Sequence, residues 1–365
     1  MNRIRVLAAL FCAAGVFCLS GCAVVSGNRS GGSALEGSEI FTAAVWNLQA
    51  LFDGDEAGNE YNEYRVSSGW NREKYEARIN AFGRAIARIG GSGPDFAGLV
   101  EIENAQVLED LARAAVKGKT WTSFAGVPGM SLGVGAVSRY PFEETRVHSI
   151  SSPGGTPPRP ILELRLKVRD RPLVFFVCHW KSKLEGDAAT ESLRRASAKI
   201  IQRRLREIRE EDPETPVIVM GDLNENYDEF YRFAGTAVRA LLPDDPVAAE
   251  LAAKENGAWD FLVLSGEKPP RSRFFPSVPA LYSPWENELA NGSFFYKNNW
   301  ETIDHFLLSD GLFDGKDWEF SDCQVLDQPP FAGASGRPAP YLPRNGLGLT
   351  DHLPLLLTLE MASKL

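Results

Sequence analysis

The stretch Val217-Ile218-Val219-Met220-Gly221-Asp222-Leu223-Asn224 decides the fold. Its first four residues are apolar, which is typical of a short strand buried on both faces. Two polar residues, Asp222 and Asn224, follow where this strand would run out into a loop. Functional side chains are common at such places, because a rigid sheet positions the loop that carries them. The stretch therefore predicts a buried strand that presents a carboxylate and an amide at its end.

The same pattern recurs along the chain, each time with a polar residue beside an apolar run. Asn47 follows residues 43–46, Glu101 follows residues 96–100, His179 follows residues 173–178, Asp304 precedes residues 305–308, and Asp351 and His352 precede residues 353–357. Each residue alone has a structural explanation, such as a turn or a cap. Together they predict that carboxylate, amide and imidazole groups gather at the ends of six strands.

Hydrophobic periodicity favours an α/β protein. Strands are predicted at residues 40–46, 96–100, 134–138, 161–168, 173–178, 217–220, 305–308 and 353–359. Apolar residues spaced four and three apart predict a helix from Arg72, capped by Asn71 and ended by Gly90-Gly91. A second helix is predicted at residues 188–210. Because several strands follow each other without a helix between them, two packed sheets are favoured over a regular βαβ repeat.

Composition excludes several classes of protein. The chain has 365 residues, 44% hydrophobic and 24% charged, which indicates a globular protein rather than a disordered or fibrous one. Its formal net charge is −9, whereas proteins that bind nucleic acid through bulk charge are usually basic. No spacing of cysteines and histidines indicates a zinc site. Cys178 and Cys323, the cysteines of the predicted folded part, are either paired or free and buried.

The N-terminus predicts export and a lipid anchor. A short basic segment precedes an uncharged apolar run at residues 6–19, which suits a signal peptide and is short for a membrane span. The next residues, Leu19-Ser20-Gly21-Cys22, resemble a bacterial lipobox, in which the cysteine is acylated and becomes the mature N-terminus. A plain signal peptide that happens to contain a cysteine is the alternative.

These features divide the chain into three parts. We predict a lipoprotein signal peptide at residues 1–21, a Ser/Gly-rich tether at residues 22–39 and one folded domain at residues 40–365. The acylated Cys22 would anchor the protein in the cell envelope, at the periplasmic or outer-membrane face.

The ordered polar motifs resemble those of the endonuclease/exonuclease/phosphatase superfamily, which includes deoxyribonuclease I-like nucleases, phosphatases and bacterial sphingomyelinases. The matching motifs are Trp46-Asn47, Leu99-Val100-Glu101, His179, Gly221-Asp222-Leu223-Asn224, Ile303-Asp304-His305-Phe306-Leu307-Leu308-Ser309 and Thr350-Asp351-His352. The resemblance implies a four-layer α/β sandwich, with two packed mixed β-sheets flanked by helices. It also implies hydrolysis of phosphate esters that depends on Mg²⁺ or Mn²⁺.

The resemblance further implies a role for each motif residue. The implied metal ligands are Glu101, Asn47 and Asp351. The implied catalytic groups are His179, Asp222, Asn224, Asp304, Asp351 and His352. The implied phosphate-binding groups are Arg159, Lys181 and Asn224. Carboxylate oxygens are hard ligands of the kind that Mg²⁺ prefers. Asp222 would orient or deprotonate the attacking water, and Asn224 would donate hydrogen bonds to the phosphoryl oxygens.

The histidines are expected to pair with carboxylates, because such a partner sets the imidazole tautomer and raises its pKa. We expect His179 to pair with Asp304. We expect His352 to be oriented by Asp351 or by another carboxylate of the set. His305 is expected to pack on the face of its strand opposite to Asp304.

Several further residues leave their role open. Glu103 is either a second metal ligand or a carboxylate at the rim of the site. Eight aromatic residues within residues 274–300 either stack on bases, contact lipid or fill the core. The basic stripe of Arg195, Lys199, Arg203 and Arg206 either contacts phosphates or forms a solvated helix face.

The sequence as a whole favours a metal-dependent phosphoesterase, with an exported nuclease as the first hypothesis. A hydrolase of phospholipids or of another small phosphate ester is the alternative. The other class of protein is a catalytically silent surface lipoprotein, and the presence of every expected catalytic residue type argues against it. The expected partners are a phosphate-ester substrate, with nucleic acid first, and the membrane through the lipid anchor. No obligate protein partner is evident.

Replacing Cys22 with serine tests the predicted anchor. The Cys22→Ser protein should be released from membranes or stall as an unprocessed precursor. The reason is that the acyl chains hold the protein on the bilayer, at about 0.8 kcal/mol for each buried CH₂. Fractionation of cells that express each form measures the effect. A processed mutant that sediments with membranes as firmly as the wild type would contradict the anchor.

Overall fold

The computed structural model describes residues 39–151, 157–255, 259–289 and 291–362. The predicted signal peptide, Cys22 and all but the last residue of the predicted tether lie outside the described residues. Export, lipid attachment and the domain boundaries therefore stay predictions. Within the described residues, no helix combines the length and the apolar character that crossing a membrane requires.

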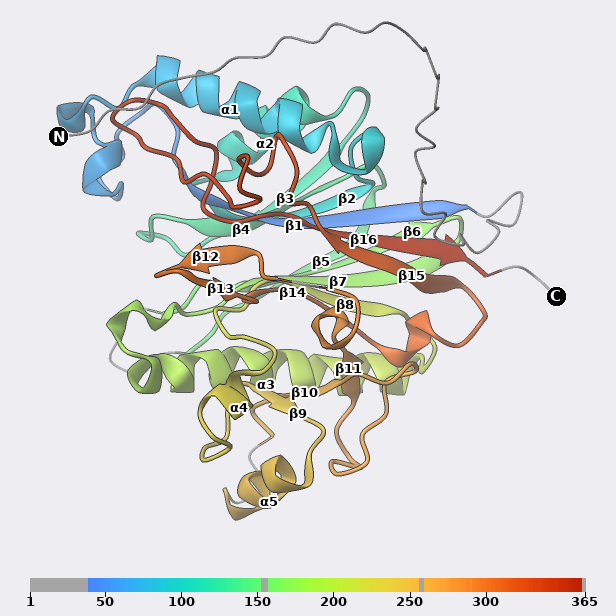
Figure 1. The fold of residues 1–365 in the computed structure, drawn as a ribbon. Helices are drawn as coiled ribbons and strands as arrows, with labels where there is room; N and C mark the ends of the chain where they lie inside the picture. Colours follow the sequence, from blue (N-terminus) through green and yellow to red (C-terminus); the bar gives the residue numbers. More distant parts are fainter. Residues whose placement is uncertain (1–38, 152–156, 256–258, 290, 363–365) are drawn as a thin grey trace, which may run out of the picture. The chain divides into compact units, whose positions relative to one another are not determined.

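Two mixed β-sheets pack face to face (Figure 1). The first has six strands in the order β15-β16-β1-β2-β4-β3. Its strands are β1 (Ile40–Leu51), β2 (Phe96–Ile102), β3 (Trp121–Ala125), β4 (Gly133–Ser138), β15 (Trp318–Val325) and β16 (Leu355–Met361). β1 and β2 are parallel, and the other neighbours in this sheet are antiparallel.

The second sheet has eight strands in the order β5-β6-β7-β8-β14-β11-β10-β9. Its strands are β5 (Phe142–His148), β6 (Ile161–Val168), β7 (Arg171–His179), β8 (Val217–Asp222), β9 (Leu241–Pro243), β10 (Leu262–Ser265), β11 (Ala280–Tyr282) and β14 (Asp304–Leu308). β7 and β8 are parallel, and β14 runs antiparallel to β8. A separate hairpin consists of β12 (Phe294–Tyr296) and β13 (Asn299–Glu301).

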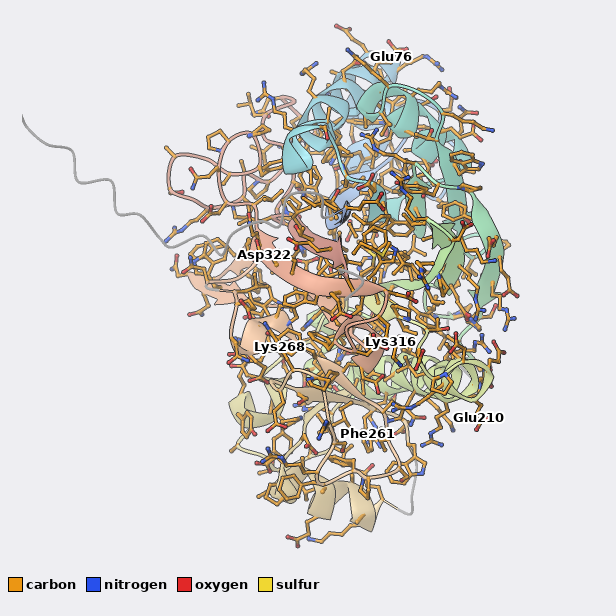
Figure 2. All side chains as sticks on the ribbon, turned by 90° about the vertical axis from the view of Figure 1, so that its right-hand side faces the viewer. Glu76, Glu210, Phe261, Lys268, Lys316 and Asp322 are labelled. Atoms are coloured by element: carbon orange, nitrogen blue, oxygen red, sulfur yellow. The ribbon has the colours of Figure 1, made fainter. Side chains whose placement is uncertain are left out.

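Helices cover the outer faces of both sheets. α1 (Arg72–Ile86) and α2 (Ala105–Ala115) lie on the first sheet, and α3 (Asp187–Glu211) lies on the second (Figure 1). In the view turned by 90°, Glu76 on α1 and Glu210 on α3 lie on opposite sides of the two sheets (Figure 2). The short helices are α4 (Glu229–Arg232), α5 (Pro246–Lys254) and the 3₁₀ turns Asn62–Tyr64, Val66–Ser68, Ile89–Gly91, Lys183–Glu185, Pro284–Glu286 and Asp310–Leu312. This layering confirms the predicted four-layer sandwich.

Strand alternation builds the cores between the layers. On β7, Phe175 points between the two sheets and stacks on Phe96 with ring centroids 4.0 Å apart. The next residue, Phe176, points to the other face and packs in the core that includes Ile201 and Leu205 of α3. Because both faces of such strands are buried, they appear in the sequence as continuous apolar runs rather than as alternating ones.

The predicted elements are present, and the differences have local causes. All eight predicted strands form, and the Asn71 side chain caps α1 by accepting a hydrogen bond from the backbone N–H of Lys74 at 3.0 Å. α2 was not predicted, although Asn104 caps it in the same way through Val107 at 3.0 Å. Strands β9 to β13 were missed because each has only three or four residues. The longer strands β3, β5 and β15 were missed as well, and each contains several polar residues rather than a continuous apolar run.

Cys178 and Cys323 are both free and buried, and they lie in different cores. The sequence left a pair and free thiols open, and the structure supports free thiols.

Candidate active site

Strand direction brings the predicted polar residues to one end of the sandwich. β1 and β2 are parallel, as are β7 and β8, so the carboxyl ends of each pair meet at one edge of its sheet. Asn47, buried at the sheet interface, connects the two edges. Its Nδ2 atom donates to Glu101 Oε1 at 3.2 Å and to Asp222 Oδ2 at 3.0 Å. One side chain therefore contacts a carboxylate from each sheet.

Asp222 lies at the centre of the site. In the strand register it faces His179 of β7 on one side and Asp304 of β14 on the other. His179 Nε2 lies 3.7 Å from Asp222 Oδ2 and 3.9 Å from Glu101 Oε1. His352 Nε2 lies 4.0 Å from the same Asp222 oxygen. Two imidazoles and three carboxylates thus share one buried corner of the fold.

The imidazole that Asp304 contacts is that of His352, so the expectation that it pairs with His179 is wrong. His352 Nδ1 lies 2.7 Å from Asp304 Oδ2, the geometry of a donated hydrogen bond. The path of the chain explains the difference. Leu353 N–H donates to Ser293 O at 2.7 Å, and Phe294 forms an isolated antiparallel β-bridge with His352. These contacts place the His352 segment beside Asp304. The carboxylate that orients His352 is therefore Asp304, the open alternative to Asp351.

Several contacts hold the His352 ring and its backbone. The Phe294 ring stacks on the imidazole with centroids 4.5 Å apart. Trp46 Nε1 donates to the His352 carbonyl at 2.9 Å, and Thr350 Oγ1 donates to the Asn47 carbonyl at 2.8 Å. Sequence reasoning missed Ser293, Phe294 and Thr350 as supports. Two of them had a signal: Phe294 is one of the aromatic residues at 274–300, and Thr350 belongs to the motif Thr350-Asp351-His352.

The two imidazoles have opposite pKa shifts. Burial alone would lower the pKa of His352, but the negative charges of Asp304, Asp351 and Asp222 outweigh it and raise this pKa to about 10. For His179, burial and the positive charges of Arg159 and His352 act together and lower the pKa well below its usual value. Near neutral pH one ring is protonated and the other is neutral, the pattern expected where environments separate acid from base.

Burial and the charge of Asp304 raise the pKa of Asp222. Both oxygens of this carboxylate are positioned: Oδ2 accepts from Asn47, and Oδ1 accepts from the backbone N–H of Asn224 at 2.9 Å. Asn224 has a φ of 51°, and its side chain donates to the Trp180 carbonyl at 3.2 Å. Residues 217–224, the stretch from which the fold was predicted, therefore also fix the direction of the Asp222 carboxylate.

The residues present fit a divalent cation. Ligand atoms of Asp222, Asp304 and His352 lie within 4.8 Å of one another. His352 is protonated near neutral pH and donates to Asp304, so in this state it is not a ligand. Among the neighbouring carboxylates, burial and the charge of Glu101 raise the pKa of Asp351. A hard cation relieves such repulsion between neighbouring carboxylates.

Other predicted residues are distributed between the site and its surroundings. Arg159 is near enough for its charge to act on His179. Lys181 contacts Glu185 at 2.6 Å, and within the described residues no contact joins its ammonium to the site. Glu103 accepts from Asp53 N–H at 2.6 Å, outside the cluster. His305 Nε2 lies 2.8 Å from the Glu225 carbonyl on the other face of β14, as expected.

Titration of the imidazoles tests this electrostatic assignment. In the metal-free protein, His352 should stay protonated well above pH 7 and His179 should stay neutral into the acidic range. Because the folded pKa of His352 lies above the ordinary histidine value of about 6.5, its protonation stabilises the fold below that pH. This stabilisation is lost as pH rises through about 10. Asp304→Asn should lower the His352 pKa, since the nearest negative charge is gone.

NMR spectroscopy of labelled histidine measures both values, with signals assigned by single His→Gln variants. Asp314→Asn, an exposed site elsewhere on the chain, serves as the control and should leave His352 unchanged. A wild-type His352 that loses its proton near pH 6.5 would contradict the assignment.

Comparison with known proteins agrees with this geometry. A model of the endonuclease/exonuclease/phosphatase family matches residues 42–233, more than half of the chain. A search among curated protein sequences finds no significant match.

Solved structures with the same fold cover most of the chain. A family protein from Bacteroides thetaiotaomicron is 16% identical with a TM-score of 0.52, over 89% of this chain and 98% of that one. Truncated TDP2 from Caenorhabditis elegans is 12% identical with a TM-score of 0.52, over 88% and 97%. A mannosyl-6-phosphatase from B. thetaiotaomicron is 17% identical with a TM-score of 0.50, over 87% and 99%. The family match, together with this shared fold, shows that the chain belongs to the endonuclease/exonuclease/phosphatase family.

Proposed function

We propose that the chain is a metal-dependent phosphoesterase. The observation that carries the proposal is the placement of two imidazoles at one Asp222 oxygen, with His179 Nε2 at 3.7 Å and His352 Nε2 at 4.0 Å. The opposite directions of their pKa shifts support it. Hydrolysis of a phosphate ester needs a base that directs water and donors that stabilise the phosphoryl and leaving oxygens. A protonated ring, a neutral ring and a carboxylate at one corner supply these functions.

Asp222 is the group best suited to orient or deprotonate the attacking water. Its raised pKa makes it a stronger base than an exposed aspartate, which is how general bases are tuned toward neutral pH. Asn47 and the Asn224 backbone N–H hold its two oxygens, so the carboxylate has a defined direction. This positioning reduces the reorganisation that the reaction requires.

His352 is suited to donate a hydrogen bond to a phosphoryl oxygen or a proton to the leaving oxygen. Asp304 keeps its Nδ1 atom occupied, so the Nε2 side remains for substrate. Arg159 supplies positive charge near His179, where a phosphate would be attracted. His179 itself, kept neutral, is suited to accept as well as donate.

Glu101, Asn47 and Asp351 would hold Mg²⁺ or Mn²⁺. When bound, the cation would polarise the phosphoryl group and offset its negative charge. The buried Oδ1 atom of Asp304 has no hydrogen-bond partner within the described part of the chain, which adds to the excess of acceptors in this corner.

The surroundings of the site favour a small phosphate ester over a long nucleic acid. Lys181 is paired with Glu185, and Lys183 is paired with Glu229 at 2.6 Å. Their charges are thereby compensated, so they offer little attraction to successive phosphates. A solved neighbour named a mannosyl-6-phosphatase has the same fold, which is compatible with a small substrate.

The nuclease first indicated by the sequence is the second candidate. Its support is the Tyr296 ring, which is 45% exposed and parallel to Phe294 at 5.9 Å between centroids. Exposed aromatic rings beside a phosphate site stack on bases. In both cases we propose an exported, lipid-anchored enzyme, on the basis of residues 1–22.

Loss of the central groups should abolish phosphoester hydrolysis. With Mg²⁺ or Mn²⁺ present, His352→Ala and Asp222→Asn should each lower kcat at least about 10²-fold, the scale for a positioned acid or base. Removal of metal with EDTA should abolish the wild-type activity. Hydrolysis of bis(p-nitrophenyl) phosphate measures the rates, and Asp314→Asn provides the matched carboxylate control. Full activity of His352→Ala on the best substrate found would contradict the mechanism.

Salt dependence separates the two candidate substrates. For a small phosphate ester, kcat/KM should change little with salt, and Lys181→Ala should stay close to wild type while Arg159→Ala falls. A polynucleotide held through about six to ten phosphate contacts would instead lose about 10³-fold or more in affinity between 50 and 200 mM salt. Parallel assays with mannose 6-phosphate, sphingomyelin and a DNA oligonucleotide make the comparison. A steep salt dependence together with a large Lys181→Ala effect would reverse the preference in favour of the nuclease.

A further inference from the structure

Arg78 of α1 is buried behind the site without a carboxylate partner among the described residues. It is 2% exposed. Its Nη2 atom donates to the Leu48 carbonyl at 2.7 Å and to the Gln49 carbonyl at 2.8 Å, and Nη1 donates to the Ala50 carbonyl at 2.8 Å. The guanidinium also lies over the Tyr341 ring, 4.1 Å from its centroid. A longer contact joins Nη1 to the Tyr64 hydroxyl at 3.5 Å, and Nε has no partner among the described residues. A buried charge is costly unless it is hydrogen-bonded, so the guanidinium depends mainly on these three carbonyls.

The three carbonyls belong to a bulge in β1. Asn47 pairs with Val100 of β2, but the next register pair joins Leu51 with Ile102, so three residues of β1 stand opposite Glu101 alone. Gln49 and Ala50 have φ values of 48° and 56°, in the left-handed region that residues with a side chain rarely adopt. Such a conformation persists only where the surroundings impose it. The three hydrogen bonds from Arg78 are such a constraint.

The bulge in turn directs two groups of the site. Ala50 N–H donates to Glu101 Oε2 at 2.7 Å, and Gln49 N–H donates to Asn47 Oδ1 at 2.9 Å. Asn47 Nδ2 donates to the other Glu101 oxygen at 3.2 Å. Both oxygens of Glu101 are therefore held by groups whose positions follow from the backbone at residues 48–50.

We propose that Arg78 is a positioning residue of the metal site: its guanidinium holds the bulge at residues 48–50, and the bulge presents Glu101 and Asn47 to a divalent cation. The inference rests on the proposed function, in which Glu101 is a metal ligand. Arg78 acts only through the bulge and contacts neither substrate nor metal.

Arginine is required because of its shape. The planar guanidinium carries donors on two nitrogens and reaches three carbonyls that point in different directions. The ammonium of lysine carries its donors on a single nitrogen and cannot occupy both positions. Arg78→Lys therefore keeps the positive charge and removes the geometry.

Binding of Mn²⁺ to the full chain, measured by isothermal titration calorimetry, tests the proposal without relying on activity. Arg78→Lys should raise the Kd for Mn²⁺ by about 10-fold to 100-fold, the range seen when an outer partner of a metal ligand is lost. In hydrolysis assays, the Mn²⁺ concentration for half-maximal rate should rise similarly, while kcat at saturating Mn²⁺ changes much less. Arg84→Lys, an exposed position on the same helix, is the matched control and should bind as the wild type does.

A folded Arg78→Lys variant with wild-type Mn²⁺ affinity would overturn the proposal, even if its thermal stability were lower. If Arg78→Lys does not fold, Gln49→Ala decides. The Gln49 side chain holds the bulge independently of Arg78: its Nε2 donates to Tyr341 O at 3.2 Å, and its Oε1 accepts from Tyr341 N–H at 2.7 Å. A raised Kd in Gln49→Ala supports the proposal, and an unchanged Kd overturns it.

The wild type separates this inference from the function on which it rests. A wild-type chain that binds no Mn²⁺ would overturn the proposed metal dependence and this inference with it. A wild-type chain that binds Mn²⁺ and loses it in Glu101→Ala, but keeps it in both bulge variants, would overturn only the role of Arg78.

Discussion

The hydrogen bonds that Asn47 donates to Glu101 and Asp222 join the two halves of the site. Each carboxylate belongs to a different sheet, and the core between the sheets contains apolar side chains such as Phe96 and Phe175. Apolar contacts set the separation of two sheets, but they do not determine where polar atoms at the edge lie relative to one another. The buried amide supplies that directional constraint, because it holds Glu101 of one sheet and Asp222 of the other through a single nitrogen.

Burial of so much charge in one corner needs compensation, and the site provides it in two layers. Close to the chemistry, the protonated His352 lies among Asp304, Asp222 and Asp351. Behind it, the Arg78 guanidinium is held by backbone carbonyls, and the charges of Glu101 and Asp351 oppose the lowering of its pKa by burial. Left-handed backbone at Gln49, Ala50, Glu101 and Asn224 gathers around the same groups. Strain of this kind is retained where precise side-chain direction matters.

Local physics explains why much of the fold could be predicted. A strand buried on both faces needs consecutive apolar residues, so β7 and β8 were evident, and the cap at Asn71 depends only on residues within one helical turn. The short strands β9 to β13 carry too few residues for any period to appear. The convergence of the polar groups also followed, because residues at the carboxyl ends of parallel neighbours must lie at one edge.

The sequence by itself determined which residues are apolar, where the strands run out and which polar groups stand at their ends. Only the tertiary structure decided which of those groups are partners. Asp304 and His352 are 48 residues apart and meet because the Ser293–Phe294 segment contacts both of them, which no local pattern encodes. The pairing of Lys183 with Glu229 and the contacts of Arg78 with the β1 bulge arose in the same way. The spacing of apolar residues depends on neighbours along the chain, so it can be read from the sequence. An ion pair or a hydrogen bond depends on the distance between two atoms to within a few tenths of an ångström, and only the complete packing brings such distant segments together.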